Sequence, residues 1–134
     1  MVTGHTASDR AETMLLQLAR GSDLAGLAAL PSVRPLSSEG PRLRRPLLHL
    51  HRRDTLQICR ELALPIWEDP SNQSPEFARN RIRQEVLPVL EALHPGSTQR
   101  MSDLAERVSQ VRDSQTELSQ MALRVLQTLS LIHI

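Results

Sequence analysis

The chain has 134 residues, enough for one domain or for a domain with an extended arm. Its single cysteine, Cys59, excludes an internal disulfide framework and is typical of a reducing compartment. No apolar run approaches the roughly 20 residues that span a bilayer, and the first residues lack the pattern of a signal peptide. We therefore expect a cytoplasmic protein with no membrane partner.

Arginine is unevenly distributed along the chain. The net charge is only +1, yet all 16 basic residues are arginine, and between Arg34 and Arg83 ten arginines stand against six acidic residues. Arginine suits paired hydrogen bonds to phosphate better than lysine does. A genome that favours arginine codons explains the overall bias as well, whereas the local excess indicates a phosphate-rich partner.

The first half of the chain predicts a strand end followed by a helix. Val2 and Thr3 resemble the end of a strand, and the apolar spacing after them predicts a helix from about Asp9 to Arg20. Ser8 is its expected N-cap and Gly21 its expected stop. A helical turn, a loop and a short edge strand are expected next, at residues 23–29, 31–42 and 43–48.

The second half predicts two further helices around an extended stretch and a turn. The first runs from Arg52 to Leu62, and the second from Phe77 to Leu87, where Pro88 either kinks it or opens the next helix. Trp67 and Phe77 are the only large rings that we expect in an otherwise aliphatic core.

Residues 97–128 predict one long helix of roughly 45 Å, at ~1.5 Å per residue. Its apolar positions alternate spacings of three and four, as in a coiled-coil seam: Met101, Leu104, Val108, Val111, Gln115, Leu118, Ala122 and Val125. The seam must pack on the same chain or on a partner, so helix-mediated self-association is one expectation. Residues 129–134 also match a translated transposon end used in sequencing libraries, and we expect a non-native tail there.

The first polar cluster runs from Gly4 to Thr13. A glycine after a strand, followed by polar residues that open a helix, directs backbone N–H groups to one mouth, an arrangement that suits phosphate. His5 and Asp9 would lie at that mouth, where Asp9 could act as a base or hold a metal ion. On spacing alone, an ordinary capped helix with a solvated histidine explains the same pattern.

The second cluster joins residues 67–72 to an arginine-rich helix. Arg79 and Arg83 are four residues apart and share a helix face, so their guanidinium groups could clamp a phosphate. Asp69 and Ser71 could fix the preceding loop through bonds to their own backbone. A solvated basic helix after a turn explains the spacing equally well.

Together the motifs resemble tRNA(Ile)-lysidine synthetases, a family of the PP-loop (N-type) ATP pyrophosphatase superfamily. They are Gly-His-x-x-x-Asp-x-x-Glu-Thr (4–13), Arg-Gly-Ser (20–22), Gly-Leu (26–27), Arg-Pro-Leu-Leu (45–48), Glu-Asp-Pro-Ser-Asn (68–72) and Arg-Asn-x-x-Arg (79–83). The resemblance spans about residues 2–93, and the last two motifs are its most specific part. It implies an α/β, Rossmann-like parent domain of which this chain is a mostly helical part, with one to three short strands and a long C-terminal helix.

The resemblance also implies a division of the chain into parts, and the sequence departs from the family pattern at two places. Residues 1–95 correspond to the C-terminal part of the catalytic domain, 96–128 to a helical arm, and 129–134 to the non-native tail. Where the family often has two adjacent aspartates, this chain has Ser8 and Asp9. The Ser-Gly-Gly-x-Asp-Ser loop that binds ATP with Mg²⁺ is absent and expected before Met1, so we expect an internal fragment, inactive alone.

The activity implied by the resemblance is ATP-dependent ligation of free lysine to C2 of the wobble cytidine in tRNA(Ile) with a CAU anticodon. Asp9, His5, Arg79 and Arg83 would be the catalytic residues, and no residue is assigned to a metal ion. Substrate and phosphate binding would fall to Gly4, Glu12 and Asn80. Two alternatives remain: another PP-loop tRNA modifier such as a thiolase, and a non-catalytic RNA-binding or coiled-coil module.

Overall fold

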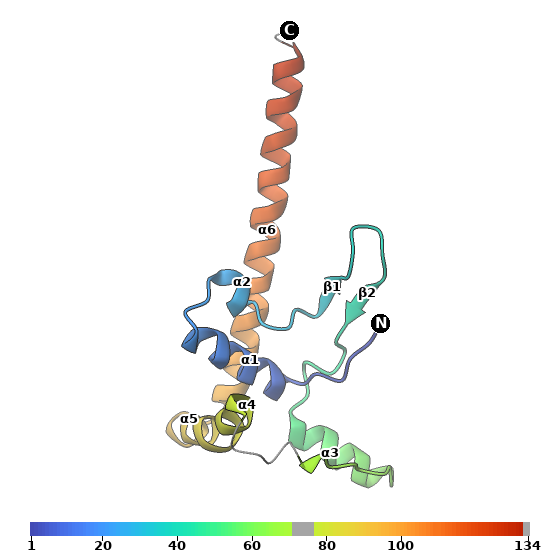
Figure 1. Ribbon diagram of the computed structural model, residues 1–134, viewed down its shortest axis with the longest axis vertical. Helices are drawn as coiled ribbons and strands as arrows, with labels where there is room; N and C mark the ends of the chain where they lie inside the picture. Colours follow the sequence, from blue (N-terminus) through green and yellow to red (C-terminus); the bar gives the residue numbers. More distant parts are fainter. Residues whose placement is uncertain (71–76, 133–134) are drawn as a thin grey trace.

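The computed structural model describes residues 1–70 and 77–132, which form a small helical body around the first part of one long helix (Figure 1). The remainder of that helix projects away from the body towards the C-terminus. Its elements, in chain order, are α1 (Ala7–Ala19), α2 (Leu24–Leu27), β1 (Val33–Pro35), β2 (Arg42–Arg44), α3 (Arg52–Glu61), α4 (Ala78–Arg81), the π-helical turn η2 (Ile82–Val86), α5 (Leu87–Leu93) and α6 (Ser97–Ile132).

Helix α1 begins two residues earlier than the sequence predicts, because Thr6 and not Ser8 is its N-cap. The Thr6 side chain accepts a hydrogen bond from the backbone N–H of Asp9, and the Asp9 carboxylate accepts one from the backbone N–H of Thr6. This reciprocal capping box satisfies two of the N–H groups that a helix start leaves unpaired. The predicted stop is confirmed, since Gly21 has a φ of +74°, which glycine adopts without strain.

The core lies where α1 and α2 pack against the first turns of α6. Met14, Ala29 and Ala105 are its buried members, with Leu27 and Met101 packed against them. The prediction that Trp67 and Phe77 lie in the core is wrong, because Trp67 is 91% exposed and Phe77 is 55% exposed. The core therefore consists of methionine, leucine and alanine side chains and contains neither ring.

The face of α6 that packs is also not the predicted one. Its buried residues are small, at spacings of four and three: Thr98, Ser102, Ala105 and Ser109. Of the predicted seam, Met101 and Val108 are half-buried, whereas Leu104 and every seam residue from Val111 onwards are exposed. Arg10 of α1 decides this orientation, since its buried guanidinium bonds the Ser102 carbonyl and pairs with Glu106 at 2.9 Å.

The strands form a two-stranded antiparallel sheet in which Arg34 opposes Leu43. The predicted loop over residues 31–42 is therefore wrong near its start, where β1 lies, and at Arg42, where β2 begins. The edge strand predicted over residues 43–48 is shorter than expected and ends at Arg44. The predicted strand end near the N-terminus is confirmed in part: Val2 forms a parallel bridge with Arg44, and the Thr3 amide donates to the Arg44 carbonyl at 3.0 Å.

The segment from α4 to α5 is one continuous helical path with a π-helical turn in its middle. Pro88 lies in the first turn of α5, immediately after that turn. Proline lacks the N–H that an α-helix needs and clashes with the preceding turn, so the wider π-turn accommodates it. Of the two alternatives predicted for Pro88, a kink or the opening of the next helix, the structure has the second, with α5 beginning at Leu87. The predicted turn residues Ser71 and Asn72 lie outside the described residues.

Helix α6 continues through Ile132, beyond the expected end at residue 128, and its described residues from 110 onwards are exposed. Among the described residues, no helix is both long enough and apolar enough to cross a membrane. The mostly helical architecture with two short strands and one long helix confirms the fold that the sequence predicts.

Candidate active site

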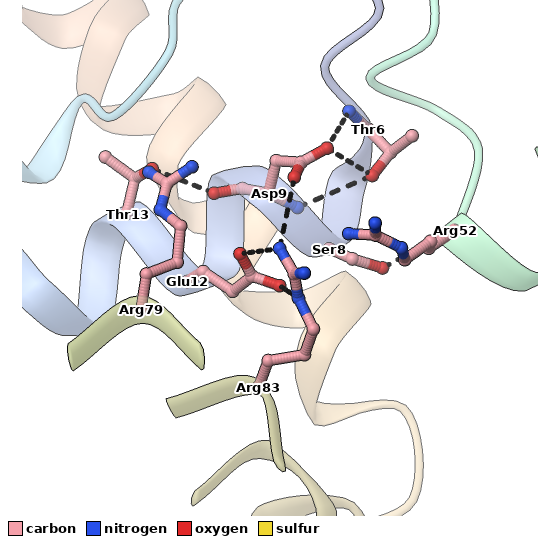
Figure 2. A network of polar contacts seen from close by, with 8 residues as sticks. All are labelled: Thr6, Ser8, Asp9, Glu12, Thr13, Arg52, Arg79 and Arg83. Atoms are coloured by element: carbon pink, nitrogen blue, oxygen red, sulfur yellow. Dashed lines mark hydrogen bonds and ion pairs between the residues drawn. The ribbon is translucent and has the colours of Figure 1, made fainter. Parts of the chain in front are cut away.

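Asp9 is a carboxylate with one oxygen fixed and the other facing a cation. Its Oδ2 accepts hydrogen bonds of 2.8 Å from both the backbone N–H and the hydroxyl of Thr6. Its Oδ1 lies 3.9 Å from Nη2 of Arg83 (Figure 2). The capping box of α1 thus orients the carboxylate at the helix N-terminus, where negative charge is favourable.

Glu12, one turn further along α1, is completely buried and pairs with Arg83. The Arg83 Nε donates to Oε1 at 2.7 Å and Nη2 donates to Oε2 at 2.9 Å, a paired geometry that adds directional strength. The hydrogen bond to Glu12 raises the pKa of the Arg83 guanidinium, against the opposing effect of its desolvation. Arg83 is therefore a fixed cation that lies between Glu12 and Asp9.

Arg79 reaches the same side of α1 as Arg83, so the prediction that the two arginines share a face is confirmed (Figure 2). Its Nη2 donates to the Thr13 hydroxyl at 2.6 Å, and that hydroxyl donates to the Asp9 carbonyl at 2.9 Å. Both arginines therefore fasten the α4 region to the first turns of α1. Their spacing in the sequence indicated this face, but Thr13 as a contact was not predicted.

His5 and Gly4 lie beside Asp9 at the mouth of α1. The imidazole Nδ1 of His5 lies 2.9 Å from the Thr3 hydroxyl. Both residues line an open hollow of about 450 Å³ together with Asp9 and with Arg52 of α3. A Cβ on Gly4 would meet no atom within 4 Å, so steric crowding does not explain this glycine. The structure thus brings together three of the predicted residues.

Asn80 is buried, and its backbone N–H donates to the Phe77 carbonyl at 2.9 Å. It therefore belongs to the packed start of α4, and its expected contact with a substrate stays a prediction.

Arg52 is a residue that sequence reasoning missed. Its backbone N–H donates to the Ser8 hydroxyl at 3.2 Å, which joins α3 to the start of α1. Its side chain lines the Asp9 hollow and a second hollow of about 540 Å³, which also contains Glu12 and Arg83. A positive charge in the first turn of a helix is unfavourable with respect to the helix dipole. The position of Arg52 directly after the N-cap His51 could therefore have indicated a functional role from the sequence.

The far wall of the second hollow is formed by Glu91 and the start of α6. The Glu91 carboxylate accepts hydrogen bonds of 2.8 Å from the backbone N–H groups of Thr98 and Gly96. Bonds from the Thr98 amide and hydroxyl, then from the Gly96 amide, lower the pKa of Glu91 to about 2, with His51 adding to the effect. Glu91 thus stays ionised and serves as a cap of α6.

In the part of the chain that the structure describes, no three His, Cys, Asp or Glu residues form a group that could hold a metal ion. Asp9 has its Oδ2 occupied by Thr6, and Glu12 has both oxygens occupied by Arg83.

Similarity to known proteins identifies the family to which this chain belongs. A PP-loop domain model matches residues 1–90. A tRNA(Ile)-lysidine synthase of Parasynechococcus marenigrum is 70% identical over 131 residues, covering 96% of this chain and 39% of that protein. One of Prochlorococcus marinus (strain SARG) is 49% identical over 128 residues, covering 96% of this chain and 38% of that protein.

A third relative, the tRNA(Ile)-lysidine synthase of Nostoc sp. (strain PCC 7120), is 58% identical over 92 residues, covering 69% of this chain and 27% of that protein. The chain spans less than two fifths of the length of the curated relatives it matches, 39% and 38% for the two longer alignments. The matched region contains α1 to η2, the start of α5 and the whole cluster around Asp9, and on this basis the chain belongs to the PP-loop domain family.

Proposed function

We propose that the chain is the part of a tRNA(Ile)-lysidine synthase that supplies side chains to the reacting centre. The observation that carries the proposal is the Asp9 carboxylate, which Thr6 orients, Arg83 faces at 3.9 Å, and an open hollow exposes to a ligand. The named relatives support the choice of substrate, since three proteins that align with this chain are tRNA(Ile)-lysidine synthases.

The proposed substrates are ATP, free lysine and a tRNA(Ile) with a CAU anticodon. ATP activates the wobble cytidine: the cytidine O2 attacks the α-phosphate and pyrophosphate leaves. The lysine amine then attacks C2, and AMP leaves as the new C–N bond forms. ATP is proposed to bind together with Mg²⁺, which would neutralise charge on its phosphates.

Asp9 is proposed to receive the proton that the lysine amine must lose. A free lysine side chain has a pKa of ~10.4 and is protonated at neutral pH, so a nearby carboxylate that takes the proton makes the amine nucleophilic. His5 lines the same hollow and is proposed to orient the lysine or the nucleotide. The adjacent Gly4 leaves the backbone at this mouth uncovered.

Arg79 and Arg83 are proposed to stabilise the charge that develops on the α-phosphate. Arg83 uses Nε and Nη2 for Glu12, and Arg79 uses Nη2 for Thr13, so each guanidinium retains further N–H donors. Glu12 and the buried Asn80 are then proposed to support binding by holding this arginine face in place.

Under this proposal residues 1–95 belong to the catalytic domain, 96–128 to a helical arm, and 129–134 to a non-native tail. We also propose that the exposed part of α6 mediates self-association of the chain. The proposed location is the cytoplasm. Sedimentation of the chain at several concentrations tests the self-association.

The test is single-turnover kinetics of the full-length enzyme with saturating tRNA. Asp9→Asn should slow lysine incorporation while pyrophosphate release stays near its normal rate. Arg79→Ala should lower the rate of pyrophosphate release by ~10²–10³-fold, the typical effect of removing one transition-state donor. Arg112→Ala, on the exposed part of α6, is the control and should leave both rates unchanged. Equal rates in Asp9→Asn and Arg112→Ala would reject the role of Asp9.

A further inference from the structure

A third hollow, of about 260 Å³, lies beside the active-site cluster, between α3 and the extended segment that follows it. Its lining comes from three elements: Ile66, Trp67, Glu68 and Asp69 of the extended segment, Arg52 and Leu56 of α3, and Arg83 and Gln84 of η2. We call it the Trp67 hollow. Arg52 also lines the two hollows that contain Asp9 and Glu12, and Arg83 lines the one that contains Glu12, so the Trp67 hollow adjoins the reacting centre through these two arginines.

The indole of Trp67 has no cover in this structure, with 91% of its surface exposed. A large aromatic ring gains free energy when it is buried, so a ring this exposed is a candidate contact for a partner. An aromatic ring next to a guanidinium is the combination that single-stranded nucleic acid sites use. Bases stack on the ring, and phosphates bond the cation.

Charged groups of both signs line the hollow. Arg52 is exposed, and among residues 1–70 and 77–132 its guanidinium has no carboxylate partner at ion-pair distance. Glu68 and Asp69 line the same hollow, as does Arg83, which is paired with Glu12. A carboxylate accepts hydrogen bonds from the exocyclic amino groups of cytosine, adenine or guanine, whereas uracil has no such group. The hollow thus offers one contact to a phosphate, one to a base face and one to a base edge.

We propose that the Trp67 hollow binds one unpaired nucleotide of the RNA substrate, with the base stacked on Trp67 and its phosphate bonded by Arg52. The proposal rests on the proposed function, because it requires an RNA substrate. A base in a duplex has both faces covered by its neighbours, so only an unpaired base can stack on the indole. Glu68 then gives a preference for bases that carry an amino group.

Trp67 is the only tryptophan of the chain, so its fluorescence reports on this hollow alone. We expect single-stranded oligocytidylate to quench the emission in a saturable way. Oligouridylate of the same length should bind more weakly, and an RNA duplex should cause little quenching. Emission that responds equally to all three ligands, or to none, would overturn the proposal.

Variants separate the three contacts. Trp67→Ala should weaken binding of oligocytidylate about 5- to 150-fold, measured by fluorescence anisotropy of labelled RNA, since stacking on one aromatic ring contributes ~1–3 kcal/mol per base. Glu68→Ala should reduce the preference for oligocytidylate over oligouridylate. Far-UV circular dichroism confirms that each variant keeps its helical content.

Arg52→Ala should weaken binding about tenfold and reduce the slope of log K against log salt by about 0.7, the value for one lost phosphate contact on a single strand. The bond to Ser8 uses the Arg52 backbone, so the substitution leaves it in place. The matched control is Arg60→Ala, which removes the same charge from the last turn of the same helix. Equal losses in the two variants would overturn the role of Arg52.

These measurements contain neither ATP nor lysine. If the full-length enzyme forms lysidine but the RNA affinity is insensitive to Trp67 and Arg52, the hollow assignment fails and the proposed function stands. If RNA quenches Trp67 but the full-length enzyme transfers no lysine to tRNA, the hollow assignment stands and the proposed function fails.

Discussion

Arg83 and Glu12 lie 71 positions apart in the chain and form a paired contact, with Nε 2.7 Å from Oε1 and Nη2 2.9 Å from Oε2. The carboxylate is completely buried and the arginine side chain is 21% exposed. This contact fastens the π-helical turn η2 to α1, one turn away from Asp9. The position of the candidate catalytic carboxylate relative to the α4 region therefore depends on a buried ion pair.

Arg83→Met should destabilise the fold by about 3–5 kcal/mol, because it leaves the Glu12 carboxylate buried without a cation. The double variant Glu12→Gln, Arg83→Met should recover much of that loss, since it removes the uncompensated charge. Urea unfolding followed by circular dichroism measures both. Arg81→Met, which removes only the exposed pair with Glu85, is the control and should change the midpoint little. A double variant no more stable than Arg83→Met would contradict the charge argument.

Thr6→Ala should lower stability by about 1 kcal/mol, because the side chain of Thr6 is the cap of α1 and also bonds the Asp9 carboxylate. Ser8→Ala should cost less, since the Ser8 hydroxyl accepts the Arg52 backbone N–H at 3.2 Å and does not cap α1. Thermal unfolding of both variants under identical conditions compares them. A larger loss in Ser8→Ala would restore Ser8 as the cap.

The acid stability of the protein should depend on Glu91. Its pKa is lowered from 4.5 to about 2 in the folded state, chiefly by hydrogen bonds from Thr98 and Gly96. The folded state therefore binds this proton less readily than the unfolded state does. The resulting stabilisation is complete above pH 4.5 and is lost as the pH falls through 4.5 towards 2.

Glu91→Gln should reduce stability at neutral pH and should flatten its dependence on pH in that acidic range. Urea midpoints measured at intervals from neutral pH down to pH ~3 follow the effect. Glu117→Gln is the control, because Glu117 lies on the exposed part of α6. Parallel curves for wild type and Glu91→Gln would show that the cap of α6 does not depend on this carboxylate.

The packing face of α6 predicts opposite outcomes at two positions. Ala105→Leu should destabilise the fold by about 1–3 kcal/mol, because Ala105 is completely buried and a larger side chain forces apart the helices that pack there. Leu118→Ala should have little effect on unfolding of the monomer, because Leu118 is 65% exposed. Urea unfolding at low protein concentration makes the comparison. A neutral Ala105→Leu together with a costly Leu118→Ala would indicate the coiled-coil seam that the sequence predicts.

The sequence by itself determined the elements whose signals are local. The spacing of Met14 and Leu18 and the glycine at position 21 placed the first helix and its end. Pro88 marked the change of helix before α5, and the arginine spacing placed Arg79 and Arg83 on one face. These features depend on backbone geometry and on neighbours within a turn or two, and such information is fully contained in a short stretch of chain.

Tertiary structure alone decided which of several local options is used. Thr6 and Ser8 are both good caps, but the Ser8 hydroxyl accepts the backbone N–H of Arg52 in α3, and Thr6 is the cap of α1. The buried guanidinium of Arg10 turned the small residues of α6, and not its heptad seam, towards α1. The pairing of Glu12 with Arg83 was also decided by tertiary structure. Contacts between residues 71 positions apart depend on how the helices pack, and the local spacing of residues carries no signal for them.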